Sequence, residues 1–132
     1  MSTHQLIQTV RDFLLALERF DGESAANLLH PAAQRIEFPN KLKPAGSTQT
    51  VAQMVADVPK AKTILASQRY DVLHLATADD LVVAELTWNG KLNADIGTLQ
   101  AGDEMIAHCA AAFAFSDGKI VAIRNYDCFE DF

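Results

Sequence analysis

The sequence predicts an α+β fold, with helices first along the chain and a mainly antiparallel sheet after them. Up to about residue 65, apolar residues recur with helical spacing, whereas beyond residue 66 they alternate with polar ones, as in half-buried strands. Asp117-Gly118 separates two long apolar runs and is a pair typical of a tight hairpin turn. With 132 residues, the chain is expected to form a single domain, residues 1–132, with its own core.

The first two predicted elements are helices. Ser2 and Gln5 form a capping box, and the apolar stripe behind it predicts an amphipathic helix over residues 3–20. Asp21 can cap a second, shorter helix. His30-Pro31 is expected to end that helix, because the residue before a proline is pushed out of the helical region.

A short strand and a third helix follow. Residues 34–38 alternate polar and apolar side chains, and the prolines and glycine of residues 39–46 indicate a loop. Thr50 and Gln53 form another capping box, and the apolar spacing after it predicts a helix that stops near Pro59. Residues 61–65 either resume this helix or lie outside it.

The sheet is expected to occupy the second half of the chain. Residues 68–76 and 81–88 alternate as strands, with a turn at residues 78–80 between them. Asn89-Gly90 indicates another turn, and the residues from there to Gly102 are expected to be a loop or a ragged edge strand.

The hairpin around Asp117-Gly118 decides which side chains share a face of the sheet. With a two-residue loop, counting outward from the turn places His108 directly opposite Asp127, at a Cβ separation of ~5 Å. With a three-residue loop and a bulge at Gly118, His108 instead faces Tyr126. Both registers are open, and the chemistry of the site depends on the choice.

Composition and motifs exclude several classes of protein. The net charge of −6 and the scattered eleven Lys and Arg argue against nucleic-acid binding. No apolar run is long enough for a membrane span and no signal peptide is evident, so we expect a cytoplasmic protein. The chain lacks the spacings of metal, nucleotide and nucleophilic-serine motifs, so neither cofactor nor metal is expected. The cysteines, Cys109 and Cys128, face each other in neither register and are expected to be free thiols.

The chain resembles the nuclear transport factor 2-like superfamily, and within it the SnoaL-like proteins, over essentially its whole length. The resemblance rests on the two N-terminal helices and four later segments: Trp88-Asn-Gly90, Ala101-Gly102, Phe113-Ala-Phe-Ser-Asp-Gly-Lys-Ile120 and Arg124-Asn-Tyr-Asp127. It implies a cystatin-like cone, in which a strongly bent sheet and about three helices enclose a hydrophobic pocket, and a homodimer formed through the outer sheet face. It indicates fold better than activity, because the superfamily includes cyclases, isomerases, epoxide hydrolases and non-catalytic modules.

The resemblance also suggests roles for particular residues. Asp127 corresponds to the aspartate that moves a proton in SnoaL-like cyclases, with His108 as its partner. Side chains expected to contact a small hydrophobic substrate are Tyr126, Trp88, Phe113 and Glu37. The first helix offers no tyrosine of the kind that ketosteroid isomerases use, and two acids flanking an arginine, the epoxide hydrolase set, are not evident.

The functional prediction is therefore a cofactor-independent cyclase or isomerase type of reaction on a small carbonyl compound, with Asp127 as base. The alternative is a non-catalytic module that binds a hydrophobic molecule or dimerises. Each residue also has a simpler interpretation: Asp127 could pair with Arg124, His108 could be satisfied within the core, Glu37 could be solvated, and the aromatic residues could be packing residues.

Overall fold

The computed structural model describes residues 1–132 and confirms the α+β class. Its helices are α1 (Thr3–Glu18), α2 (Gly22–Asn27) and α3 (Val51–Ile64), none of them both long and apolar enough to cross a membrane. Its strands are β1 (Leu29–Glu37), β2 (Ser47–Thr50), β3 (Leu65–Ala78), β4 (Leu81–Leu92), β5 (Glu104–Ser116) and β6 (Lys119–Phe129).

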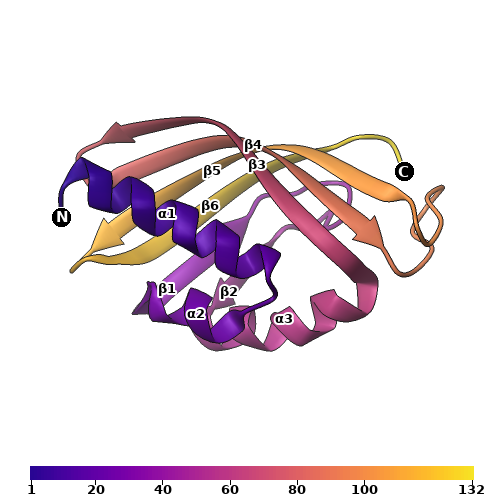
Figure 1. The fold of residues 1–132 in the computed structure, drawn as a ribbon, viewed down its shortest axis with the longest axis horizontal. Helices are drawn as coiled ribbons and strands as arrows, with labels where there is room; N and C mark the ends of the chain where they lie inside the picture. The colour runs from indigo at the N-terminus through magenta and orange to yellow at the C-terminus, as the bar shows by residue number, and fades with distance from the viewer.

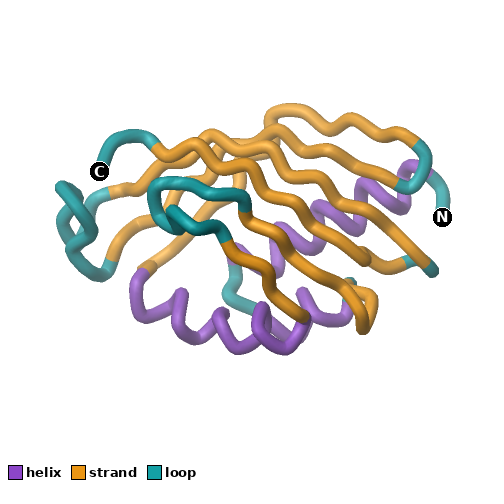
Figure 2. The backbone as a smooth tube through the Cα atoms, turned by 180° about the vertical axis from the view of Figure 1, so that it is seen from behind, coloured by secondary structure: helices purple, strands orange, loops and turns teal.

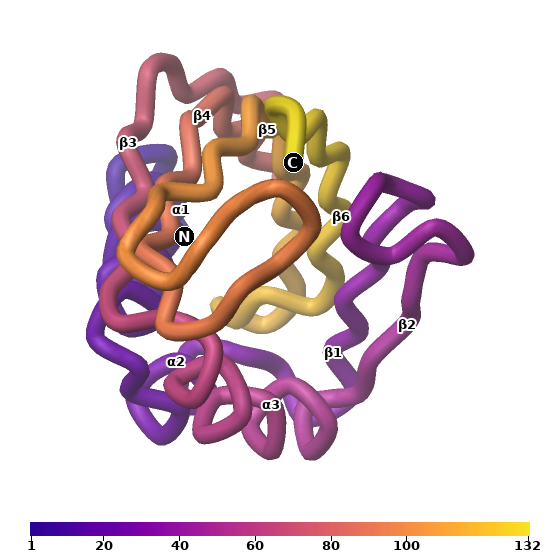
Figure 3. The backbone as a smooth tube through the Cα atoms, turned by 90° about the vertical axis from the view of Figure 1, so that its right-hand side faces the viewer, coloured from indigo at the N-terminus to yellow at the C-terminus, as the bar shows by residue number.

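The strands form one sheet in the order β2-β1-β6-β5-β4-β3. All neighbours are antiparallel except β1 and β6, which run parallel, so the expected mainly antiparallel sheet is confirmed. The sheet is strongly curved, and α1 crosses its concave side while α2 and α3 lie near β1 and β2 (Figures 1 and 3). Seen from behind, the strands lie in front of the helices, so the helices cover one face only (Figure 2). The expected cone is therefore confirmed.

Helix α1 supplies one half of the core. Its predicted capping box is present, with the Ser2 hydroxyl accepting from the Gln5 amide at 3.2 Å and the Gln5 side chain accepting from the Ser2 amide at 2.8 Å. Its buried stripe packs on inward-facing residues of β4, β5 and β6 in one cluster of 18 buried residues. The stripe consists of Leu6, Val10, Phe13, Leu14 and Ala16.

The second helix and the first strand meet earlier than predicted. Helix α2 ends at Asn27, and β1 already begins at Leu29, which pairs with Ile120 of β6. His30-Pro31 therefore lies inside a strand rather than at a helix end. The register between β1 and β6 shifts between Leu29 and Gln34, and such an irregularity accommodates a proline that cannot donate to the ladder.

Helix α3 runs unbroken through Pro59, so the predicted stop there is wrong. A proline removes one backbone hydrogen bond, but the helix continues on both sides of Pro59. None of the residues of α3 is fully buried, although several face the interior. The helix therefore lines the cavity, while its residues Val51 and Met54 pack against the core.

Strand β4 extends to Leu92, so the turn predicted at Asn89-Gly90 is also wrong. Both residues lie in the ladder, opposite Ile106 and Met105 of β5. Gly90 serves a different purpose, because a Cβ atom there would lie only 2.5 Å from Cη2 of Trp88. The predicted loop before Gly102 is present over residues 93–103, with one isolated bridge between Ile96 and Leu99.

The last hairpin has the predicted two-residue turn, with Ser116 opposite Lys119. However, β6 carries one extra residue, Val121, between the pairs Phe115–Ile120 and Ala114–Ala122. A one-residue bulge moves every later side chain to the opposite face. His108 consequently pairs with Cys128, and Asp127 pairs with Cys109. The predicted pairing of His108 with Asp127 is wrong, and so is the alternative pairing of His108 with Tyr126.

Candidate functional site

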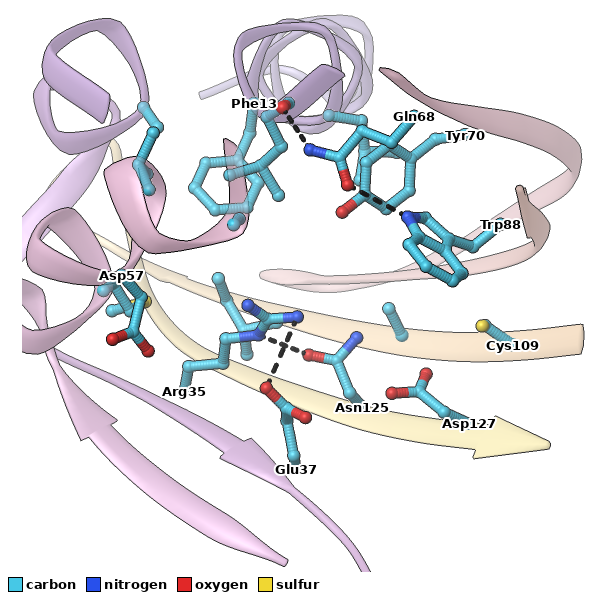
Figure 4. A pocket seen from close by; sticks show the side chains of 18 of the residues that line it. Phe13, Arg35, Glu37, Asp57, Gln68, Tyr70, Trp88, Cys109, Asn125 and Asp127 are labelled. Atoms are coloured by element: carbon cyan, nitrogen blue, oxygen red, sulfur yellow. Dashed lines mark hydrogen bonds and ion pairs between the residues drawn. The ribbon is translucent and has the colours of Figure 1, made fainter. Parts of the chain in front are cut away.

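A cavity of about 240 Å³ lies between the helices and the concave face of the sheet. Hydrophobic residues make up 21 of the 29 that line it. Ligand sites are commonly apolar cavities in which a few polar groups converge. Such a group of polar side chains is present here, on β1, β3 and β6 (Figure 4).

The polar groups reach the cavity because of how β1 and β6 pair. Arg35 and Glu37 are two residues apart on β1, as are Asn125 and Asp127 on β6, so each pair shares one face of its strand. In the parallel register Glu37 lies opposite Asn125. The four side chains therefore stand together on the concave side of the sheet (Figure 4).

Asp127 is a half-buried carboxyl group. None of the ion pairs in the chain includes it. Burial raises the pKa of Asp127 above its ordinary value, while the thiol of Cys109 and the charge of Arg35 act to lower it. A carboxyl group with a raised pKa in an apolar cavity is a suitable proton acceptor.

Arg35 is held in place by its neighbours on the sheet. Its Nε donates to Oδ1 of Asn125 at 2.9 Å, and its terminal Nη2 lies 3.8 Å from a carboxylate oxygen of Glu37. The same Glu37 oxygen accepts from Nζ of Lys43 at 3.2 Å. Glu37 is thus shared between two cations and is almost covered, with 11% of its side chain exposed.

Tyr70, on β3, faces this group across the same polar end of the cavity (Figure 4). It lies on the same face of β3 as Gln68 and Val72. Its ring points toward Arg35 (Figure 4). Burial raises the pKa of Tyr70 to about 12, so its hydroxyl keeps its proton at neutral pH. Within the protein only its backbone amide donates a hydrogen bond, to Glu18 at 2.7 Å. Its hydroxyl group is therefore available to a bound molecule.

Aromatic side chains form the walls near these groups. Trp88 donates from its indole Nε1 to Gln68 at 3.0 Å, and the Gln68 amide donates to the carbonyl of Leu17 at 2.6 Å. Because its N–H is already used, Trp88 presents mainly its ring to the cavity. Phe113 is 1% exposed and packs edge to face on Phe13, with ring centroids 6.0 Å apart.

The structure brings four of the six predicted site residues to the cavity: Asp127, Trp88, Phe113 and Glu37. The other two, His108 and Tyr126, lie on the outer face of the sheet. His108 is 60% exposed and pairs with Glu130 at 2.7 Å, and Tyr126 stacks on Phe38. The Val121 bulge explains the error for Tyr126, because it reverses the faces of β6, and it breaks the predicted contact between His108 and Asp127.

Sequence reasoning missed several polar cavity residues, among them Arg35, Tyr70 and Asn125. The spacing of Arg35 and Glu37 could have predicted that both side chains lie on one face, since residues two apart on a strand point to the same side of the sheet. Tyr70 carried a weaker signal, as a polar-tipped residue within an alternating strand. The place of Asn125 depended on the bulge, which no residue pattern indicated.

These features define a class: a bent-sheet cone that encloses an apolar cavity with a carboxyl group, a guanidinium and a phenol at one end. No cluster of three or more His, Cys, Asp or Glu lies where it could hold a metal ion. The family model of the SnoaL-like domain matches residues 10–123, and the chain belongs to that family.

Solved structures show the same fold. AclR, a candidate hydroxylase from Streptomyces galilaeus, matches with a TM-score of 0.77 and 16% identity over 96% of this chain and 80% of that one. IdmH, a candidate polyketide cyclase from Streptomyces antibioticus, matches with a TM-score of 0.77 and 17% identity, over 94% of this chain and 92% of that one. An NTF2-like protein of unknown function from Burkholderia pseudomallei matches with a TM-score of 0.76 and 20% identity, over 98% of this chain and 92% of that one. No curated protein sequence matches significantly.

Proposed function

We propose that the protein binds a small hydrophobic carbonyl compound and moves a proton on it without a cofactor, as a cyclase or isomerase does. Asp127 is the general base. The observation that carries this proposal is its position: a carboxyl group with a raised pKa, outside every ion pair, at the polar end of an apolar cavity.

In the reaction, the carboxylate of Asp127 takes a proton from the carbon next to the carbonyl group, and the electron pair moves onto the carbonyl oxygen. The resulting enolate attacks an electrophile within the same molecule in a cyclase, or regains a proton at another carbon in an isomerase. The hydroxyl of Tyr70 can donate to the charged oxygen, because it has no other partner and keeps its proton. Trp88 and Phe113 contact the apolar body of the substrate.

Family membership supports a reaction of this kind. A candidate polyketide cyclase is among the solved structures with this fold. At 17% sequence identity, its likeness to this chain shows a shared fold and not a shared activity. The assignment of chemistry to this chain therefore depends on its own cavity residues.

Proton transfer can be tested before the natural substrate is known. The protein is incubated in D₂O with a panel of one-ring ketones and β-keto esters, and deuterium uptake at the acidic carbon is followed by NMR. We expect faster exchange with at least one compound, and a loss of about 10²- to 10⁴-fold of that acceleration in Asp127→Asn. Asp79→Asn is the matched control, because Asp79 lies in an exposed turn whose positive φ suits asparagine.

If Asp127→Asn keeps the exchange rate of the native protein, the base is not Asp127 and the mechanism is wrong. If compounds bind to both proteins but neither accelerates exchange, the alternative of a non-catalytic binding module holds instead. Protein-observed NMR shifts on addition of the same compounds separate binding from turnover.

A second candidate reaction is epoxide hydrolysis. One observation favours it: Arg35 shares the cavity with several acids, among them Glu37 and Asp127, a set that was not evident from the sequence. Against it, Lys43 also neutralises Glu37. Release of a diol from small cyclic epoxides, lost in Asp127→Asn, would identify this reaction.

We further propose that the protein forms a homodimer through the outer face of the sheet. Helices leave that face uncovered (Figure 2). Tyr126 and Phe38 stack on each other there, with 49% and 37% exposure. A monomer in analytical ultracentrifugation at micromolar concentration would contradict this assembly.

A further inference from the structure

The guanidinium of Arg35 has donors that the protein does not use. Only Nε makes a hydrogen bond, to Asn125, and the contact of Nη2 with Glu37 is 3.8 Å, beyond hydrogen-bond distance. The side chain is 25% exposed and points into the cavity (Figure 4). A guanidinium carries five N–H donors in a rigid fork, so its two terminal amino groups are free for a bound molecule.

Arg35 also has no carboxylate partner of its own within ion-pair distance, although the charges of Glu37 and Asp127 both act on it. Glu37 is the nearest carboxylate, but it lies closer to Lys43, at 3.2 Å. Lys43 thus takes the partner that Arg35 would otherwise bind. Asn125 fixes the guanidinium without neutralising it, because an amide oxygen carries no net charge.

The adjoining space sets the size of the molecule that can reach this group. A cavity of about 150 Å³ can hold a benzene ring. This cavity, at about 240 Å³, has room for one ring and a short substituent. Its wall carries the rings of Trp88 and Phe113, while Arg35 and Tyr70 stand at the polar end.

We propose that Arg35 is an anion anchor: its terminal amino groups hold the planar oxyanion of a one-ring ligand, and Lys43 keeps them available by neutralising Glu37. As an account of the substrate, this inference rests on the proposed function, in which the oxyanion is the enolate left when Asp127 takes the proton. The transfer leaves the total charge of the site unchanged, since Asp127 becomes neutral as the substrate becomes negative. A one-ring carboxylate is likewise planar and carries its negative charge on oxygen, but needs no reaction to form.

Benzoate is therefore a suitable probe, and its binding is measured by calorimetry at pH 7. We expect Arg35→Met to weaken binding by about 10- to 100-fold, the effect of losing a charged hydrogen bond. Arg35→Lys keeps the charge but not the fork, so it should retain part of the affinity. Arg11→Met, on the exposed face of α1, is the matched control and should bind as the native protein does. Unchanged binding in Arg35→Met overturns the proposal.

The part assigned to Lys43 has its own test, which does not depend on the folding of an Arg35 variant. Lys43→Met should weaken benzoate binding several-fold, because Glu37 then turns its charge toward Arg35. The added change Glu37→Gln should restore the affinity. A merely structural lysine would not be rescued in this way, and an unrescued loss would refute the role of Lys43.

Asp127→Asn separates this inference from the proposed function. Removing a negative charge beside Arg35 should tighten benzoate binding, whether or not the protein catalyses proton transfer. Benzoate is tested up to 50 times a dissociation constant of ~1 mM. If neither the native protein nor Asp127→Asn binds it at that concentration, the anchor is refuted while the base assignment stands. If benzoate binds through Arg35 but no compound exchanges its proton, only the proposed reaction fails.

Discussion

Replacing Gly90 by alanine tests the placement of the only tryptophan in the chain. The indole of Trp88 lies over Gly90, two residues along the same face of β4. A Cβ at position 90 would approach Cη2 and Cζ2 of Trp88 at 2.5 and 2.6 Å and Cδ2 of Leu65 at 2.9 Å. Since ordinary contacts begin near 3.4 Å, the ring has to move by roughly 1 Å.

The cost of that movement can be worked out term by term. Overpacking of this kind destabilises by about 1 to 3 kcal/mol. Displacing the indole also breaks its 3.0 Å hydrogen bond to Gln68, and the loss of that bond costs a further ~1 kcal/mol of stability. Alanine also lowers the conformational entropy of the unfolded chain, which stabilises the folded protein by about 0.4 to 1 kcal/mol. We expect Gly90→Ala to lower the free energy of unfolding by about 1 to 3 kcal/mol.

Urea denaturation followed by the fluorescence of Trp88 measures both effects in one sample, because the sequence contains a single tryptophan. The midpoint should fall, and the emission of the native variant should change as the indole leaves Gln68. In a Trp88→Phe background, followed by circular dichroism, the added Gly90→Ala should cost clearly less, because the smaller ring leaves room. An equally stable Gly90→Ala protein with unchanged emission would show that the indole does not lie over Gly90.

Two further outcomes are expected. Because burial raises the pKa of Asp127, the native state loses stability as pH rises from the ordinary value of 3.8 through the folded pKa, and the loss is complete above it. Asp127→Asn should therefore raise Tm more at pH 8 than at pH 4; an equal difference at both pH values would contradict burial as the cause. His108→Ala should change proton exchange by less than about twofold and stability by less than ~1 kcal/mol, because its exposed side chain pairs with Glu130 outside the cavity; a large loss of activity would return His108 to the mechanism.

The sequence alone determined the elements whose signals are local. Capping boxes at Ser2 and Thr50 located the starts of α1 and α3, and the alternation after residue 66 located β3 and β4. Asp117-Gly118 predicted the turn of the last hairpin correctly. Together with the resemblance, these signals were sufficient for the α+β class and the cone, because hydrophobic period and turn chemistry are written in neighbouring residues.

The tertiary structure decided which residues form the site. A single unpaired residue, Val121, turned Asp127 toward Cys109 and the cavity and turned Tyr126 to the outer face, and a bulge has no sequence signature here. Gly90 looked like a turn residue, yet its missing Cβ makes room for an indole. Arg35 contacts Asn125 only because β1 and β6 pair in parallel, although 90 positions separate the two residues in the sequence. Register and long-range pairing are set by how all the strands pack together, and local residue patterns do not contain that information.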